Sequence, residues 1–135
     1  MRQVEFTLRE RGRGVHLVTD EVMSRLGALP EVGLLHLFVK HTSCGLALNE
    51  NWDPDVRHDL GVVLNELVPE GNRSFLHTME GSDDMPSHAK SVLTGVSLTI
   101  PITDGRLNMG TWQGIYLLEF RNHGGPRRVV ATIID

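Results

Sequence analysis

The chain has 135 residues, of which 40% are hydrophobic and 22% charged, which is the composition of an ordinary globular domain. Its formal net charge of −4 argues against a nucleic-acid-binding surface as its main role, because such a surface needs a dense basic patch. No stretch approaches the roughly 18 apolar residues of a membrane span, the N-terminus has no apolar signal segment, and a single cysteine cannot form an internal disulfide. We therefore expect a cytoplasmic protein with no membrane or nucleic-acid partner.

The first third of the chain predicts three strands and one helix. Alternating apolar residues over 4–8 indicate a half-buried strand, and residues 15–18 a second, shorter one. Residues 19–29 carry apolar side chains at helical spacing. Residues 32–39, VGLLHLFV, are apolar at both odd and even positions, which predicts a strand covered on both faces.

The middle of the chain predicts a polar-edged strand and then two helices. The strand is the apolar alternation within 41–51, HTSCGLALNEN. Asp53-Pro54 is a helix start, since aspartate caps free amides and proline fits the first helical position. A second helix runs from about 85 to 94 and ends at Gly95. The buried stripe expected of the first helix consists of Val56, Leu60, Val63, Leu64 and Leu67.

Beyond Gly95 the sequence has the apolar and β-branched residues that are typical of β-strands. The segments SLTIPIT, RLNMG, GIYLLEF and RRVVATII follow one another with a turn at Asp104-Gly105, which predicts a β-meander. The fold class is therefore α+β, a single domain over residues 1–135 with an antiparallel sheet system. The chain is too short for a TIM barrel and lacks the glycine-rich phosphate loops of standard nucleotide enzymes.

Three of the seven histidines stand in polar surroundings near the expected ends of elements. They are His41, His77 and His88, and neutral imidazoles are good ligands for zinc. Their spacing matches no short zinc motif, so a structural or surface role stays open for each. His36, inside VGLLHLFV, is better explained as a hydrogen-bonded core residue.

The sequence closely resembles the YjbQ family over nearly its whole length. The resemblance is carried by HTSCGLALNEN, DPDVRHDL and HTMEGSDDMPSHAKSVLTGVSLTIPITDGRLNMGTWQGIYLLEFR. It implies a small α+β sandwich that assembles as a homotrimer, with a secondary thiamine-phosphate synthase activity. It also points to His41, His77 and His88 as the polar cluster of the shared pocket. Their assignment as ligands of a divalent metal, zinc before magnesium or another ion, is our inference.

Several residues of 41–51 are candidates for chemistry. Cys44 as a nucleophile would need a nearby base and a lowered thiol pKa, which the sequence does not indicate, so we assign it a structural role. Thr42 and Ser43 offer hydroxyls to a phosphate, although such groups often satisfy the backbone. His41 and Glu50 are the candidate catalytic groups, with Glu50 as an acid/base or as a partner that orients a histidine; a solvated carboxylate is the alternative.

Groups for an anionic substrate come from elsewhere in the chain. Lys90 and Arg106 are expected to meet phosphate at the pocket rim, with solvated charges as the alternative. Trp112 and Gln113 offer an aromatic wall and an amide to a ring, although a tryptophan at a strand start often serves packing.

These residues favour metal-assisted chemistry on a phosphorylated small molecule. Thiamine-phosphate formation needs alignment and stabilisation of the leaving pyrophosphate, which a divalent metal with Lys90 or Arg106 would supply. We expect low turnover. The alternatives are a metal-dependent hydrolase or phosphatase-like enzyme with Glu50 as base, and a non-enzymatic metal- or anion-binding module.

Overall fold

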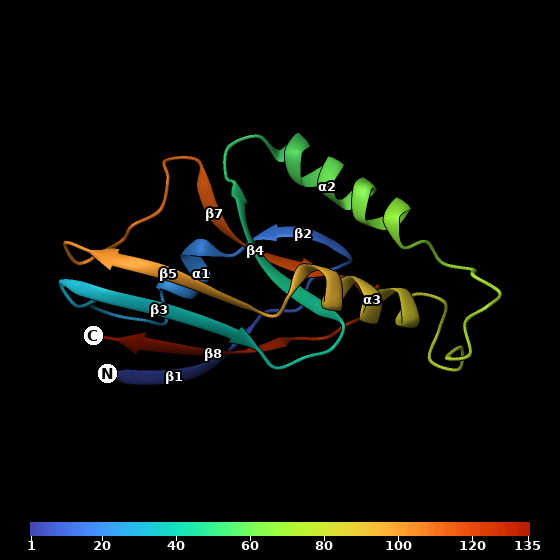
Figure 1. Ribbon diagram of the computed structural model, residues 1–135, viewed down its shortest axis with the longest axis horizontal. Coiled ribbons are helices and arrows are strands. Elements are labelled where there is room, and N and C mark those ends of the chain that lie inside the picture. Colours follow the sequence, from blue (N-terminus) through green and yellow to red (C-terminus); the bar gives the residue numbers. More distant parts are fainter.

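Two antiparallel sheets and three helices form the protein in a computed structural model that describes all residues, Met1–Asp135 (Figure 1). The larger sheet has the order β1 (Arg2–Leu8), β8 (Arg127–Ile134), β3 (Val32–Val39), β5 (Ser97–Thr103) and β6 (Arg106–Leu107). The smaller sheet has the order β2 (Gly14–Leu17), β7 (Gln113–Glu119) and β4 (Cys44–Glu50). The α+β class with antiparallel sheets is confirmed. None of the helices has the length and apolar character needed to cross a membrane.

The main core lies between the two sheets. It takes alternate side chains of the strands, such as Leu35 and Leu37 of β3 and Ile115 and Leu117 of β7, all of them fully buried. Burying an aliphatic side chain of this size contributes about 1.5–3 kcal/mol each, so this layer is the main source of stability. The two termini end side by side, and the Met1 amino group contacts the Asp135 carboxylate.

The prediction that residues 32–39 form a strand covered on both faces is wrong within one chain, and β7 is covered in this way instead. Every residue of β7 after Gln113 is buried, because the sheet core lies on one side and α2 (Pro54–Leu67) on the other. The outer face of β3 is open instead, where Val32 is 69%, Leu34 40% and Phe38 42% exposed. His36 lies on this outer face with Nδ1 3.1 Å from Thr99 Oγ1, so it is hydrogen-bonded as predicted but is not a core residue.

The helices begin where the capping residues indicate. Asp53 accepts a hydrogen bond of 2.9 Å from the Asp55 amide at the start of α2, as predicted. The predicted second helix is α3 (Asp84–Thr94), and Gly95 follows it with a φ of 92°. The first helix, α1 (Thr19–Met23), is shorter than the predicted 19–29. The chain turns at Gly27, where a φ of 66° is incompatible with a continuing right-handed helix.

The stripe predicted for α2 is less buried than expected. Leu60 and Leu64 pack against the outer side of β7, but Val63 and Leu67 are 55% and 63% exposed. No residue of α2 is fully buried. The helix therefore covers the smaller sheet as an outer layer and is not enclosed by the core (Figure 1).

The C-terminal strands do not form the predicted meander. Only β5 and β6 are hairpin neighbours, joined by Asp104 and Gly105 with φ values of 54° and 74°, the conformation that a tight hairpin turn requires. The next strand, β7, pairs with β2 and β4 in the other sheet, and β8 pairs with β1 and β3. Turn residues specify local reversal but do not specify which distant strand becomes the partner, and this is why the prediction was wrong.

The contact between α3 and β4 generates a prediction for stability. A Cβ at Gly45 would lie 2.9 Å from the Gly95 carbonyl and still closer to Thr94 Oγ1. Gly45→Ala should therefore push α3 away and lower the free energy of unfolding by about 1–3 kcal/mol. Gly61→Ala is the matched control, since its Cβ meets nothing within 4 Å and alanine favours a helix by about 0.5–1 kcal/mol. Urea unfolding measures both, and equal stability of the two variants would contradict this packing.

Candidate functional site

Two histidines and an aspartate meet at the start of α3. His77 lies in the loop before the helix, and Asp84 and His88 stand one turn apart on the same helical face. Asp84 Oδ2 is 2.6 Å from His77 Nε2 and 3.1 Å from His88 Nε2. One ligand atom from each residue lies within 4.8 Å of the others. We call this group the histidine centre; it is the one cluster of three or more such side chains in the chain that is close enough to hold a metal ion.

The orientation of His88 is set by the main chain. Its Nδ1 lies 2.8 Å from the carbonyl oxygen of Thr42, and a carbonyl only accepts, so Nδ1 carries the proton. In a neutral ring this leaves a lone pair on Nε2, which faces an oxygen of the Asp84 carboxylate. Two lone pairs at this distance repel each other unless a cation, either a second ring proton or a metal ion, lies at Nε2.

Arg121 holds the carboxylate of the histidine centre. Its Nη1 donates to Asp84 Oδ1 and its Nε donates to Asp83 Oδ2 at 2.9 Å, so the second oxygen of Asp84 is left for the histidines. Burial raises the pKa of Asp84, but the hydrogen bond from His77 and the charges of His88 and Arg121 outweigh it and hold the pKa below its usual range. Asp84 is therefore an anion aimed at two imidazoles, and its side chain is only 6% exposed.

An open groove of about 780 Å³ runs beside His88. Its walls come from the end of β3, from Lys40 to Thr42, and from the residues around Ser91 and Val96 on the α3 side. A smaller hollow of about 200 Å³ is lined in part by His77. The histidine centre therefore borders a space large enough for a small organic phosphate.

His41 lines the groove but does not belong to the histidine centre. Its Nε2 accepts a hydrogen bond of 2.7 Å from the Arg128 amide, so the proton of the neutral ring is on Nδ1. Burial and the charge of Arg127 lower the pKa of His41, which favours the neutral imidazole at pH 7. The structure thus brings together His77 and His88 as predicted, with Asp84 as their third member in the place expected for His41.

The main-chain carbonyls of residues 42 and 43 make hydrogen bonds to neighbouring elements, while the phosphate contact expected of their hydroxyls stays a prediction. The Thr42 carbonyl accepts from His88, and the Ser43 carbonyl accepts from Arg127 at 3.1 Å. Thr42 also lines the groove. Its hydroxyl makes no hydrogen bond within the chain.

Lys90 does not lie at the rim of the groove, where it was predicted to meet a phosphate. Its side chain is buried, with the residue 1% exposed, and Nζ donates to Asn65 Oδ1 at 2.8 Å while lying 5.7 Å from the centre of the Phe120 ring. Burial lowers the pKa of Lys90. The long methylene stem allows the residue to fill space beneath α2, so it fastens a helix and does not reach the groove. The other lysine, Lys40, lines the groove instead.

The remaining predicted residues lie at the opposite ends of the strands. Glu50 is at the far end of β4 from Cys44, where its carboxylate accepts from the amides of Trp52 and Asp53. Trp112 is 59% exposed and meets Trp52 edge to face, and Gln113 Oε1 accepts from the Gly110 amide. In one chain these residues do not join the histidine centre.

Arg106 is also separate from the histidines. It follows the β5–β6 turn and lines a shallow hollow formed by residues 103–108. This end of β5 pairs with Val32, whereas the other end of β3 leads to His41. Arg106 therefore does not meet a phosphate at the groove in a single chain.

Sequence reasoning missed Asp84 and Arg121. A signal for Asp84 was present, because Asp84 and His88 in DDMPSH have the spacing of two residues on one helical face. No local signal marked Arg121, which lies 37 positions from Asp84 and reaches it only through the sheet topology.

Fold and site together define a small α+β protein with a carboxylate between two imidazoles. A family model described as UPF0047 protein YjbQ-like matches residues 4–135, and the chain belongs to this family. The UPF0047 protein YjbQ of Salmonella typhimurium is 53% identical over 133 residues, covering 97% of this chain and 96% of the relative. Two crystal structures of hypothetical proteins are also similar.

The protein TT1486 of Thermus thermophilus is 36% identical with a TM-score of 0.85, covering 97% of this chain and 99% of the other. The protein APE1520 of Aeropyrum pernix is 30% identical with a TM-score of 0.83, covering 99% of this chain and 98% of the other. These similarities establish family and fold. The chemistry of the site has to be argued from its residues.

The single cysteine generates a prediction for reactivity. Cys44 is fully buried, and burial raises the pKa of its thiol to about 12, so the thiolate is scarce near pH 8. A disulfide-exchange reagent should label native Cys44 only as fast as the protein opens, and should label it at once in denaturant. Ser74→Cys in a Cys44→Ala background is the exposed control. Labelling of native Cys44 at the rate of that control would restore the nucleophile hypothesis.

Proposed function

We propose that the histidine centre binds a divalent transition metal, zinc first, and acts on a phosphorylated small molecule held in the adjacent groove. The observation that carries this proposal is the arrangement of His88. The proton on its Nδ1 points to the Thr42 carbonyl. The free lone pair on its Nε2 therefore faces Asp84 Oδ2, the same oxygen that His77 Nε2 contacts. A cation at this point removes the repulsion between lone pairs.

The residues fit zinc better than magnesium. Zinc takes imidazole and carboxylate ligands at about 2.0–2.2 Å in a tetrahedron, which separates ligand atoms by about 3.3 Å. The present separations of 2.6 and 3.1 Å reach that value with small side-chain movements. Magnesium prefers an all-oxygen octahedron. Three protein ligands would leave the fourth position open for substrate, and the bond from His88 to a carbonyl is the usual support of a metal-binding imidazole.

Thiamine-phosphate synthesis is the reaction we propose for this site, as a low-level activity. The thiazole nitrogen bonds to the pyrimidine methylene carbon while the bond from that carbon to the pyrophosphate oxygen breaks, so charge gathers on the leaving pyrophosphate. A bound divalent metal supplies Lewis-acid stabilisation of that charge. The His41 Nδ1–H and the Thr42 hydroxyl lie on the groove and can donate to phosphate oxygens, and Lys40 adds positive charge.

Hydrolysis of a phosphate ester is the second candidate. The Nε2 lone pair of His41 already accepts from the Arg128 amide, so His41 is not the base here, and its Nδ1–H would donate to a phosphate oxygen while a metal held by the histidine centre would supply an activated water. Glu50 no longer serves as the base in this scheme, since its carboxylate is occupied at the other end of β4. A metal-binding module without turnover is the third. A cytoplasmic location stays a prediction from the sequence.

The proposal predicts separable effects on metal binding and turnover. His77→Ala, Asp84→Asn and His88→Ala should each weaken zinc binding by about a hundredfold or more, because two ligands do not complete the site. His41→Ala should retain zinc and lose turnover. His58→Ala, on the exposed face of α2, is the control that should change neither. Calorimetry with zinc and an assay with the pyrimidine pyrophosphate and thiazole phosphate measure these effects.

The outcomes distinguish the three candidates. Formation of thiamine phosphate that needs the histidine centre supports the proposal. Release of phosphate from simple esters alone supports the hydrolase, and zinc binding without either activity supports the binding module. Zinc affinity that is equal in the wild type and in the three ligand variants would remove the metal site itself.

We also propose a homotrimer that covers the outer face of β3. Val32, Leu34 and Phe38 form an exposed apolar row on this face, and Ile134 of β8 beside them is 39% exposed. A row of this kind on a paired strand is typical of a protein–protein contact. A second copy of the chain would bury it.

Light scattering tests this assembly. The wild type should have a mass three times the 15.0 kDa of one chain, and Phe38→Glu should dissociate it, because a charge would be buried in an apolar contact. Val63→Glu on the exposed side of α2 is the control and should stay assembled. A monomeric wild type would overturn the trimer, and a trimeric Phe38→Glu variant would overturn this surface.

A further inference from the structure

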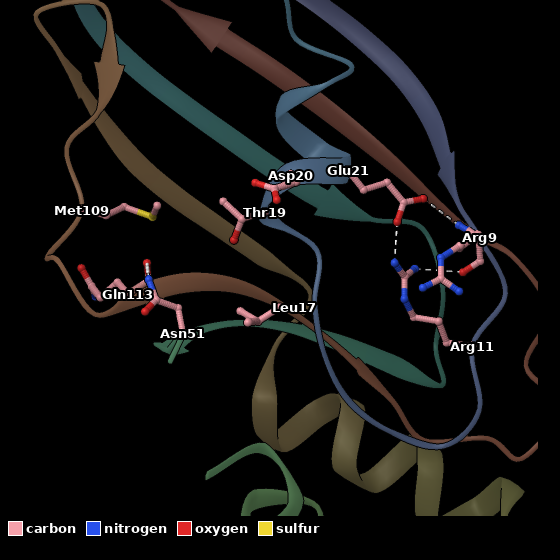
Figure 2. Close-up of a pocket in the computed structure, with 9 residues that line it drawn as sticks. All are labelled: Arg9, Arg11, Leu17, Thr19, Asp20, Glu21, Asn51, Met109 and Gln113. Atoms are coloured by element: carbon pink, nitrogen blue, oxygen red, sulfur yellow. Dashed lines mark hydrogen bonds and ion pairs between the residues drawn. The ribbon is translucent and has the colours of Figure 1, made fainter. Parts of the chain in front are cut away.

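A second cavity is lined by residues that belong neither to the histidine centre nor to the groove beside it. It has a volume of about 740 Å³ and is bordered by the segment after β1, by the start of α1 and by the ends of β4 and β7 (Figure 2). It shares no residue with the groove beside His88. Seven of its nine lining residues are polar or charged, so its chemistry suits a polar ligand.

One side of this cavity carries a surplus of positive charge. The Arg11 side chain is 6% exposed, and its Nη2 lies 2.5 Å from Glu21 Oε2. The other carboxylate oxygen of Glu21 accepts from the Arg9 amide at 3.0 Å. Both oxygens are therefore occupied, while the Arg9 guanidinium beside Arg11 makes no hydrogen bond or ion pair within the chain. Two guanidinium groups face a single carboxylate, which leaves one positive charge and free N–H donors for an anion.

This cationic side is built on fixed supports. Arg11 Nη1 donates to the Arg9 carbonyl at 3.0 Å, so Arg11 and Glu21 tie the segment after β1 to α1. Burial raises the pKa of Glu21, but the hydrogen bond from Arg11 and the Arg9 amide outweigh it and lower the pKa, so the carboxylate is ionised. An anion would thus meet the fixed charge of Arg11 beside the free donors of Arg9.

The other side of the cavity offers acceptors. Asp20 has no hydrogen-bond or ion-pair partner for its side chain in the protein, and Figure 2 shows it with Thr19 on the side toward Asn51 and Gln113. Asn51 Nδ2 donates to the carbonyls of Thr111 and Gln113, which leaves its Oδ1 as a free acceptor. A carboxylate and an amide oxygen in this arrangement suit a protonated amine.

Between these two sides Leu17 lines the cavity, which suits a short aliphatic spacer, and Met109 lies at the far end beside Gln113 (Figure 2). We propose that this cavity binds a small zwitterion, a primary amine joined by a short chain to a phosphate or carboxylate, with the anionic group on Arg9 and Arg11 and the ammonium group on Asp20 and Asn51.

Titration calorimetry with a graded set of probes tests this site. The probes are aminoalkyl phosphates of increasing chain length, the same alkyl phosphates without the amine, and ω-amino carboxylates. At least one aminoalkyl phosphate or amino carboxylate should bind saturably, and the better series identifies the anionic group. Arg9→Gln should weaken all binding roughly ten- to a hundredfold, because a charge-assisted hydrogen bond is lost. Asp20→Asn should weaken the amine-bearing probes by a similar factor and leave the alkyl phosphates unchanged.

Matched variants test whether binding depends on the cavity itself. Arg73→Gln and Asp59→Asn remove the same charges from exposed positions outside the cavity and should leave binding unchanged. His77→Ala should also leave it unchanged, since the histidine centre is elsewhere. Absence of saturable binding by every probe, insensitivity to both Arg9→Gln and Asp20→Asn, or loss of binding in His77→Ala would each overturn the proposal.

Discussion

The buried ion pair between Glu119 and Arg127 holds together the end of the protein where the histidine centre lies. Glu119 ends β7 and Arg127 begins β8, so the pair joins the two sheets, and the side chains are 0% and 4% exposed. Gly124 makes room for it, since a Cβ there would lie 2.5 Å from the guanidinium. Arg127 also donates to the Ser43 carbonyl, and the amide that follows it donates to His41. Removing one partner of such a pair costs about 3–5 kcal/mol, because the other charge stays buried alone.

The elements that the sequence predicted correctly are those whose signals are local. Asp53 and Pro54 act on the backbone within two residues, and Gly95 ends a helix through its own φ. The distribution of strands over two sheets is set by contacts between distant segments, so similar apolar runs had different outcomes. Residues 113–119 became a strand covered on both faces, whereas 32–39 has one open face in a single chain. The difference is the presence of α2 over one strand and of no element over the other.

The candidate site, like the fold, was predicted correctly only where the signals in the sequence are local. Polar surroundings identified His77 and His88, and helical spacing would have added Asp84. The position predicted for Lys90 was wrong because nearness to His88 in the sequence does not put two side chains on one side of a helix. The Lys90 side chain points toward α2, where it contacts Asn65. Arg121 was not predictable, since its relation to Asp84 exists only after β7 is placed beside the start of α3. The sequence thus predicted which kinds of side chain form the site, whereas the partner of each side chain could be found only from the fold.

The length of β7 decides which residues of one chain can act together. A strand rises about 3.3 Å per residue, so the seven residues from Gln113 to Glu119 separate the two ends of the strand by roughly 20 Å. The histidine centre lies toward the Glu119 end, and Gln113, in the wall of the cavity proposed to bind a zwitterion, lies at the other. The histidine centre and this cavity have no residue in common, so a ligand in one would not directly contact the residues of the other. Trp112 and Arg106 lie at the ends of strands far from the histidines, and either would reach a phosphate there only from another copy of the protein.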